Sequence, residues 1–124
     1  KFNKKAYIFC DQNNEILSKR GMCQEKYAPC STFKILLALI CYTENILKDA
    51  KNPALPFQQD YCDDFELWKQ DHYPSMWIKN SCVWYSQILT KQLGIEKLQK
   101  YVKPHNPQLF LYCLTKFCRR SSAF

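Results

Sequence analysis

Glycine is almost absent from this chain: its 124 residues include only Gly21 and Gly94. Tight hairpin turns and close backbone approaches use glycine more than any other residue, so a barrel or sandwich with many hairpins would be hard to build from this composition. No G-x-G or G-K-[ST] sequence occurs, which excludes the nucleotide-binding loops that depend on those motifs. We therefore expect an α+β domain that is mostly helical and has little sheet.

Long apolar runs and paired cysteine motifs are also missing. The longest apolar run, residues 35–42, is too short to cross a membrane and suits a buried helix. The eight cysteines include no C-x-x-C pair, and neither histidine follows a cysteine pair at zinc-finger spacing, so no metal site is expected. An even number of cysteines leaves disulfides open without indicating their pairing. The chain begins at Lys1 without a signal-peptide pattern.

The composition is that of a single domain with a buried core. Hydrophobic residues make up 47% of the chain, and 18 Lys and Arg against 11 Asp and Glu give a net charge of +7. A basic chain could bind nucleic acid, which would require lysines gathered on one face among aromatic residues. Here the lysines at 91, 97, 100 and 103 fall on the outer side of two amphipathic segments. That pattern favours solvated helix faces, so a nucleic-acid partner is not expected.

Hydrophobic patterning predicts a short hairpin followed by a buried helix. The β-prone residues 6–10 and 16–18 flank a polar turn, and Gly21 ends the hairpin. From Thr32 to about Tyr42 apolar residues recur at helical spacing. Ser31 stands where the N-cap of that helix belongs.

The rest of the chain is predicted to alternate loops and helices. Residues 48–61 and 71–75 are rich in Pro, Asp and Asn and are expected to form loops. The predicted helices are residues 63–69, 83–93 and 96–102. Gly94 is expected to cap the second of these helices, and Pro104 to stop the third.

The start of the buried helix carries the pattern Ser31-Thr32-Phe33-Lys34. A capping box would place Glu or Gln three residues after the serine, whereas the cation of Lys34 would face the positive end of the helix dipole. Serine and lysine one turn apart share a helix face, and burial beside that dipole lowers the pKa of a lysine. Lys34 could then act as a general base for Ser31. On spacing alone, an N-cap serine with a lysine reaching to solvent is the more frequent arrangement.

Two segments resemble the active-site motifs of class D serine β-lactamases. Residues 27–35, Tyr-Ala-Pro-Cys-Ser-Thr-Phe-Lys-Ile, are similar to the P-x-S-T-F-K segment of that family. Residues 79–87, Lys-Asn-Ser-Cys-Val-Trp-Tyr-Ser-Gln, are similar to its S-x-V segment. The similarity continues through residues 68–70 and 93–102, so that it covers about residues 6–103.

The resemblance implies a role for each matched residue. Ser31 would be the nucleophile that forms an acyl-enzyme, and Lys34 the general base, working as a lysine N-carboxylated by carbon dioxide. Ser81 would relay a proton to the leaving lactam nitrogen, although taken alone it is more simply a helix N-cap before Val83. Val83 would line the apolar pocket around the lysine, and Trp68 would flank the substrate cleft. No other cofactor and no metal is implied.

The chain departs from the family pattern at about Lys103. The Tyr-Gly-Asn motif, the tryptophan loop and the Lys-Thr/Ser-Gly strand of the family do not occur in residues 104–124. A premature stop after a shifted reading frame would produce such a tail. We therefore expect a single partial domain over residues 1–124, family-like over 6–103, with a divergent tail that packs poorly against the core.

Taken together, the resemblance implies a partial β-lactamase/penicillin-binding transpeptidase-like fold, consisting of an N-terminal hairpin and a helical subdomain. The expected activity is opening of the β-lactam ring of penicillins, impaired by truncation. Two alternatives stay open: acylation without turnover, as in β-lactam sensor domains, and a non-catalytic small basic binding protein. The implied location is periplasmic or secreted, and the chain has no expected membrane span. Substrate range and oligomeric state are left open.

Overall fold

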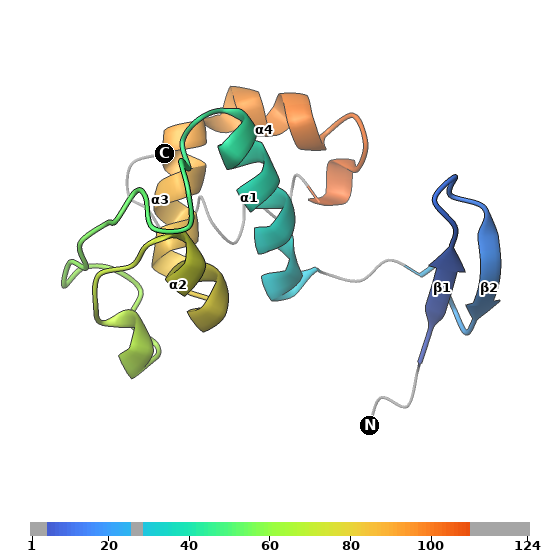
Figure 1. The fold of residues 1–124 in the computed structure, drawn as a ribbon, viewed down its shortest axis with the longest axis horizontal. Coiled ribbons are helices and arrows are strands. Elements are labelled where there is room, and N and C mark those ends of the chain that lie inside the picture. The colour runs from blue at the N-terminus through green and yellow to red at the C-terminus, as the bar shows by residue number, and fades with distance from the viewer. Residues whose placement is uncertain (1–4, 26–28, 110–124) are drawn as a thin grey trace.

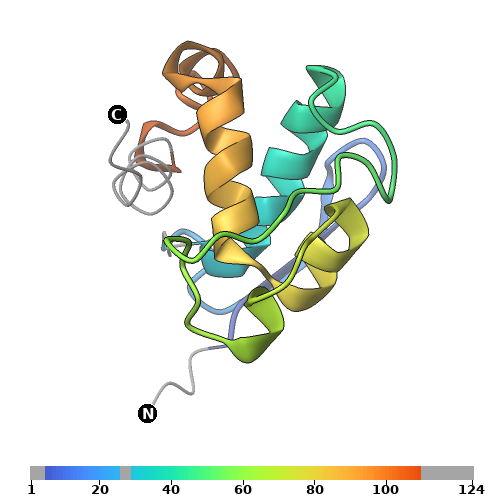
Figure 2. The same ribbon diagram turned by 90° about the vertical axis from the view of Figure 1, so that its left-hand side faces the viewer.

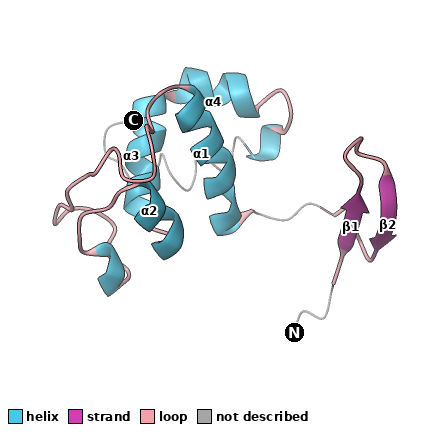
Figure 3. Cartoon of the chain, viewed as in Figure 1, coloured by secondary structure: helices cyan, strands magenta, loops and turns pink. Residues whose placement is uncertain are grey.

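The computed structural model describes residues 5–25 and 29–109. In chain order its elements are β1 (Tyr7–Cys10), β2 (Ile16–Arg20), the 3-10 turn η1 (Cys30–Thr32), α1 (Phe33–Thr43), the 3-10 turn η2 (Glu66–Trp68), α2 (Pro74–Asn80), α3 (Val83–Leu93) and α4 (Ile95–Val102). The described residues thus form one two-stranded sheet and a larger helical part (Figure 3). The predicted α+β class with mostly helix is confirmed.

The predicted hairpin is formed by β1 and β2, which pair antiparallel and stand beside the helical body (Figure 1). The pairing is interrupted by an irregularity between Phe9 and Cys10. The Asp11 carboxylate closes the turn by accepting hydrogen bonds from the backbone N–H groups of Asn13 and Glu15. Every residue of both strands is exposed, so the hairpin adds nothing to the hydrophobic core.

The hydrophobic core lies where α3 packs against α1 on one side and α4 on the other (Figure 2). Side chains from α2 and from the loops complete it. The largest fully buried apolar side chains are Leu37, Leu47, Trp77, Trp84, Tyr85, Leu89 and Leu98. The segments predicted at 32–42, 83–93 and 96–102 are therefore confirmed as helices. The first is not buried on all sides as expected, because Ile35 and Leu39 are 64% and 62% exposed and the core-facing side of α1 is formed by other residues, among them Leu37.

The position of α4 is set at both of its ends. Gly94 caps α3 with its N–H bonded to the Thr90 carbonyl, and its φ of +82° lies in the left-handed region that favours glycine. Further along, the Glu44 carboxylate accepts a hydrogen bond from the Tyr101 hydroxyl at 2.6 Å and pairs with the Lys97 ammonium at 2.6 Å. These contacts fasten α4 to the end of α1.

The long loop predicted at 48–61 is confirmed, and several hydrogen bonds hold it in place. Leu55 and His72 form an isolated antiparallel bridge, with N–H to carbonyl distances of 2.8 and 3.0 Å. The Asp71 carboxylate accepts a hydrogen bond from the Phe57 N–H at 3.0 Å. The loop is thereby fixed against the segment that leads into α2.

Three local predictions were wrong. The segment 71–75 is not wholly a loop, because α2 begins at Pro74, and proline is favoured in the first turn of a helix. The helix predicted at 63–69 is only the single turn η2. Ser31 is not an N-cap: it lies inside η1, and α1 starts after Thr32 without a side-chain cap.

The remaining predictions about the tail concern chiefly residues 110–124, which lie outside the described residues. Of the part before them, Leu109 is half-buried and packs against the core. Within the described residues no helix is long and apolar enough to cross a membrane. The same residues contain no group of three side chains suited to hold a metal ion, and the cysteines at 10, 23, 30, 41 and 82 carry free thiols.

Candidate active site

The two serines singled out in the sequence meet, although fifty residues separate them. The Ser81 hydroxyl donates a hydrogen bond to Oγ of Ser31 at 2.9 Å. Ser31 lies in η1, directly before α1, and Ser81 lies between α2 and α3. Because α1 and α3 pack side by side and begin at the same end of the helical body, their N-terminal ends bring the two hydroxyl groups together (Figure 2).

Strained backbone accompanies both serines. Ser81 ends α2 in the left-handed conformation, with φ of +52° and ψ of +40°. Cys30, directly before Ser31, has φ of +49°. A non-glycine residue in this region costs on the order of 1–3 kcal/mol and persists where the surrounding structure fixes it, often at functional sites. The conformation of Ser81 turns the chain from α2 into α3 at the point where its hydroxyl reaches Ser31.

Lys34 lies in the first turn of α1 and is only 4% exposed. Burial lowers the pKa of Lys34, because removal from water penalises the ammonium form, while the neighbouring Cys82 acts weakly in the opposite direction. A lowered pKa increases the fraction of neutral amine near pH 7. That form can accept a proton, so the burial of Lys34 suits a general base one turn from Ser31.

The segment after Ser81 forms part of the core. Cys82 is fully buried, and burial raises the pKa of its thiol to about 11, so it stays protonated at neutral pH. Val83 opens α3 and is half-buried against the core. Ser81 is therefore not the N-cap of α3, since Cys82 holds that position.

Trp68 belongs to the core and is 5% exposed. Its indole Nε1–H donates to the Asn80 carbonyl at 2.9 Å, and its own carbonyl accepts from the indole N–H of Trp84 at 2.8 Å. Trp68 thus links the end of α2 to α3 through hydrogen bonds on both sides of Ser81 in the sequence. The substrate contacts expected for Trp68 and Val83 stay predictions.

Two residues beside the site, His72 and Asn80, were missed by the sequence reasoning. His72 is fully buried, with Nδ1 2.8 Å from the Gln70 carbonyl and Nε2 3.2 Å from Nδ2 of Asn80. The two residues bracket α2. Pro74 marks the first turn of the helix that ends at Asn80, but no local pattern in the sequence marks the burial of His72.

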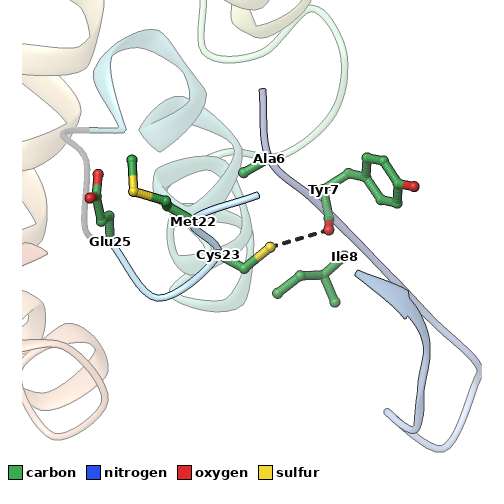
Figure 4. Close-up of a pocket in the computed structure, with 6 residues that line it drawn as sticks. All are labelled: Ala6, Tyr7, Ile8, Met22, Cys23 and Glu25. Atoms are coloured by element: carbon green, nitrogen blue, oxygen red, sulfur yellow. Dashed lines mark hydrogen bonds between the residues drawn. The ribbon is translucent and has the colours of Figure 1, made fainter. Parts of the chain in front are cut away.

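A shallow cavity of about 210 Å³ lies elsewhere, at the base of the hairpin (Figure 4). It is lined by Ala6, Tyr7, Ile8, Met22, Cys23 and Glu25. The Cys23 thiol lies within hydrogen-bond reach of the carbonyls of Tyr7, at 3.3 Å, and Arg20, at 3.1 Å, and shares its one proton between β1 and β2. None of the predicted site residues lines this cavity, which is therefore separate from the serine pair.

Comparison with known proteins decides the family. The penicillin-binding protein transpeptidase domain matches residues 2–106. The chain belongs to this family. The matched range contains both serines and the buried lysine, so the site described above lies within the family-like part of the chain.

Within the family, the chain is homologous to class D β-lactamases. It is 36% identical to β-lactamase OXA-9 of Klebsiella pneumoniae over 89 residues, which are 70% of this chain and 32% of that protein. It is 35% identical to β-lactamase OXA-1 of Escherichia coli over 85 residues, 68% of this chain and 29% of that protein. The chain thus spans about a third of the length of these curated relatives.

A solved structure shares the fold. The crystal structure of the class D β-lactamase OXA-427 matches with a TM-score of 0.69 at 44% sequence identity. The match covers 72% of this chain and 37% of the OXA-427 chain. The expected partial class D β-lactamase fold is therefore confirmed.

Proposed function

We propose that this chain carries the serine centre of a class D β-lactamase-like hydrolase, in which Ser31 opens the β-lactam ring of penicillins and forms an acyl-enzyme. The observation that carries this proposal is the 2.9 Å hydrogen bond between the Ser81 and Ser31 hydroxyls, with the buried Lys34 three residues after Ser31 in the first turn of α1. Nucleophile, base and proton relay are the three groups that acyl transfer from a lactam requires.

Each group has a defined task in the proposed reaction. Oγ of Ser31 attacks the lactam carbonyl carbon while its proton passes to the neutral form of Lys34. The lactam C–N bond then breaks, and the nitrogen takes the proton of the Ser81 hydroxyl. Ser81 is reprotonated from the lysine. The result is a penicilloyl ester on Ser31, with all protons returned to where they began except the one now on the former lactam nitrogen.

Lys34 also fits the carboxylation that the family resemblance implies. Only a neutral amine combines with carbon dioxide, and burial of Lys34 favours that form. When bound, the carboxylate would supply a general base for both acylation and deacylation. Lys34 lies on the buried side of the first turn of α1, so its side chain would keep that base near the start of the helix, where Ser31 lies.

Efficient turnover is not proposed for these 124 residues. The sequence contains no Lys-Thr/Ser-Gly strand, which in the family supplies one oxyanion donor and the anchor for the substrate carboxylate. Loss of one oxyanion donor typically costs about 10²–10³ in rate, and poorer positioning adds to this. A chain that acylates slowly would bind penicillin covalently, which is the behaviour of a sensor rather than of an efficient hydrolase.

We propose a periplasmic or secreted location, with a β-lactam as ligand.

The test is to incubate the purified chain with a labelled penicillin and to follow intact mass and hydrolysis together. We expect one penicilloyl group per chain on the wild type, slow or no hydrolysis, and no adduct on Ser31→Ala. Cys30→Ser serves as the matched control, because it removes the neighbouring nucleophile and leaves Ser31 in place. An adduct that persists in Ser31→Ala and disappears in Cys30→Ser would refute the assignment of Ser31.

A further inference from the structure

We propose that Trp68, His72 and Asn80 form a hydrogen-bonded clamp that positions Ser81, with His72 as its central positioning residue. Trp68 and Asn80 lie in segments that carry the family resemblance, whereas His72 lies in none of them. The proposal rests on the proposed function for its kinetic test, whereas its structural test is independent of any activity.

Asn80 is held from two sides directly before Ser81. Its carbonyl accepts a hydrogen bond from the indole Nε1–H of Trp68 at 2.9 Å. Its side-chain Nδ2 lies 3.2 Å from Nε2 of His72. The Asn80 carbonyl belongs to the peptide group that joins Asn80 to Ser81, so fixing this carbonyl fixes the plane of that peptide. The orientation of this plane sets φ of Ser81, which is +52°.

His72 can serve the clamp in only one protonation state. Its Nδ1 lies 2.8 Å from the Gln70 carbonyl, which only accepts hydrogen bonds, so Nδ1 carries the proton. Nε2 is then a free acceptor for the amide of Asn80. The contacts thus assign the neutral Nδ1–H tautomer to His72. The ring is fully buried and is bridged through its backbone to Leu55, so it cannot move aside at low cost.

The clamp is anchored in α3, the helix that follows Ser81. The Trp84 indole N–H donates to the Trp68 carbonyl at 2.8 Å, and the His72 ring packs edge-on against Trp84, with centroids 5.3 Å apart. Trp84 itself is 1% exposed. The residues before and after Ser81 are therefore tied to the same buried side chain. This arrangement holds Ser81 in its strained conformation, with its hydroxyl aimed at Ser31.

The kinetic test compares three variants with the wild type, all scaled to the amount of folded protein. His72→Phe keeps a buried ring and removes the acceptor, whereas His72→Gln keeps an amide that can donate to Gln70 and accept from Asn80. The matched control is Tyr85→Phe, which removes a half-buried hydrogen bond of 2.7 Å to the Pro53 carbonyl and leaves the clamp intact. Because an error of about 1 Å in positioning can cost about 100-fold in rate, we expect acylation by labelled penicillin to slow about 10- to 100-fold in His72→Phe.

The expected pattern separates positioning from stability. Tyr85→Phe should lower Tm without changing the acylation rate, and His72→Gln should recover most of the rate lost in His72→Phe. A folded His72→Phe variant that acylates at the wild-type rate would overturn the proposal.

The structural test is the nitrogen NMR spectrum of His72 in the wild-type chain, where we expect a protonated Nδ1 and an unprotonated Nε2. An Nε2–H tautomer would overturn the clamp as well. If the wild type forms no adduct, the proposed function fails, and the tautomer alone decides the clamp.

Discussion

At the scale of single residues, Lys34 is the least ordinary feature of the molecule. A lysine in the first turn of a helix meets the positive end of the dipole, and here it is also buried. Both effects disfavour the ammonium form. Lys34 therefore lowers the free energy of unfolding near neutral pH, where exposed lysines have little effect on it. Such a cost is typical of groups retained for their chemistry.

The burial of Lys34 has a measurable consequence for stability. Its folded-state pKa is lowered, so the unfolded chain binds more protons between the folded pKa and the unfolded value of 10.5. The contribution of Lys34 to stability should therefore rise with pH across that interval. We expect the free energy of unfolding of the wild type to increase relative to Lys34→Met as the pH is raised, measured by urea denaturation at several pH values.

Lys79, an exposed lysine at the end of α2, provides the control. Lys79→Met removes an ammonium group that is not buried and serves as the baseline against which the effect of Lys34→Met is measured. A constant difference between the wild type and Lys34→Met over the whole interval would mean that the ammonium form is not penalised in the folded chain.

At the scale of secondary-structure elements, the sequence predicted those elements whose limits are set locally. The helices at 83–93 and 96–102 follow from periodic apolar residues and from Gly94 between them. α2 was missed because Pro74, flanked by polar residues, is equally typical of a loop, and only the burial of Trp77 makes the segment a helix. The meeting of Ser31 and Ser81 was reached through the family resemblance, because no local rule joins residues so far apart.

The clamp residues lay beyond sequence reasoning for a related reason. His72 is a polar residue, and no local pattern in the sequence marks it as buried. Its burial results from the loop at 48–61 folding back on it and from Trp84 packing against its ring. Such a network depends on three separate segments, so it becomes visible only in the folded chain.

The prediction for the secondary-structure elements concerns Gly94, which connects two helices. It joins α3 to α4 with φ of +82° and ψ of +158°, a combination that is essentially confined to glycine. Apart from its own chain neighbours, no heavy atom of the described residues lies within 4 Å of the place where a Cβ would stand, so the cost of Gly94→Ala is one of backbone strain. We expect it to lower the free energy of unfolding by about 1–3 kcal/mol, measured by chemical denaturation.

The control for this prediction is Gln92→Ala, at an exposed position in the last turn of α3. It should be nearly neutral, since alanine is a good helix former. Equal effects of the two substitutions would contradict the account of Gly94 as a linker that requires its positive φ.

At the scale of the whole molecule, the hairpin is the part whose apolar side chains are exposed to solvent. Large apolar side chains of β1 and β2 are widely exposed, with Phe9 at 61% and Leu17 at 70%. β1 and β2 pair only with each other among the described residues, so each has one open edge. Open, apolar strand edges are sites of association between chains.

We therefore expect the chain to self-associate as its concentration rises, measured by sedimentation velocity. Leu17→Lys should weaken this association, because it replaces a widely exposed apolar side chain of β2 by a charge. Gln12→Lys adds the same charge at the turn of the hairpin and should have little effect. Association that responds equally to both substitutions would point to net charge rather than to the strand edge.

The three tryptophans of the chain, Trp68, Trp77 and Trp84, are all buried, and each indole N–H donates to a protein acceptor. Two of these bonds belong to the network around Ser81. The tryptophan fluorescence of the unmodified chain is therefore emitted from the buried core beside the serine centre. A shift of this emission to longer wavelength would report exposure of the indole rings to water before any substrate is added. The emission spectrum of a variant could thus show whether this core is still packed.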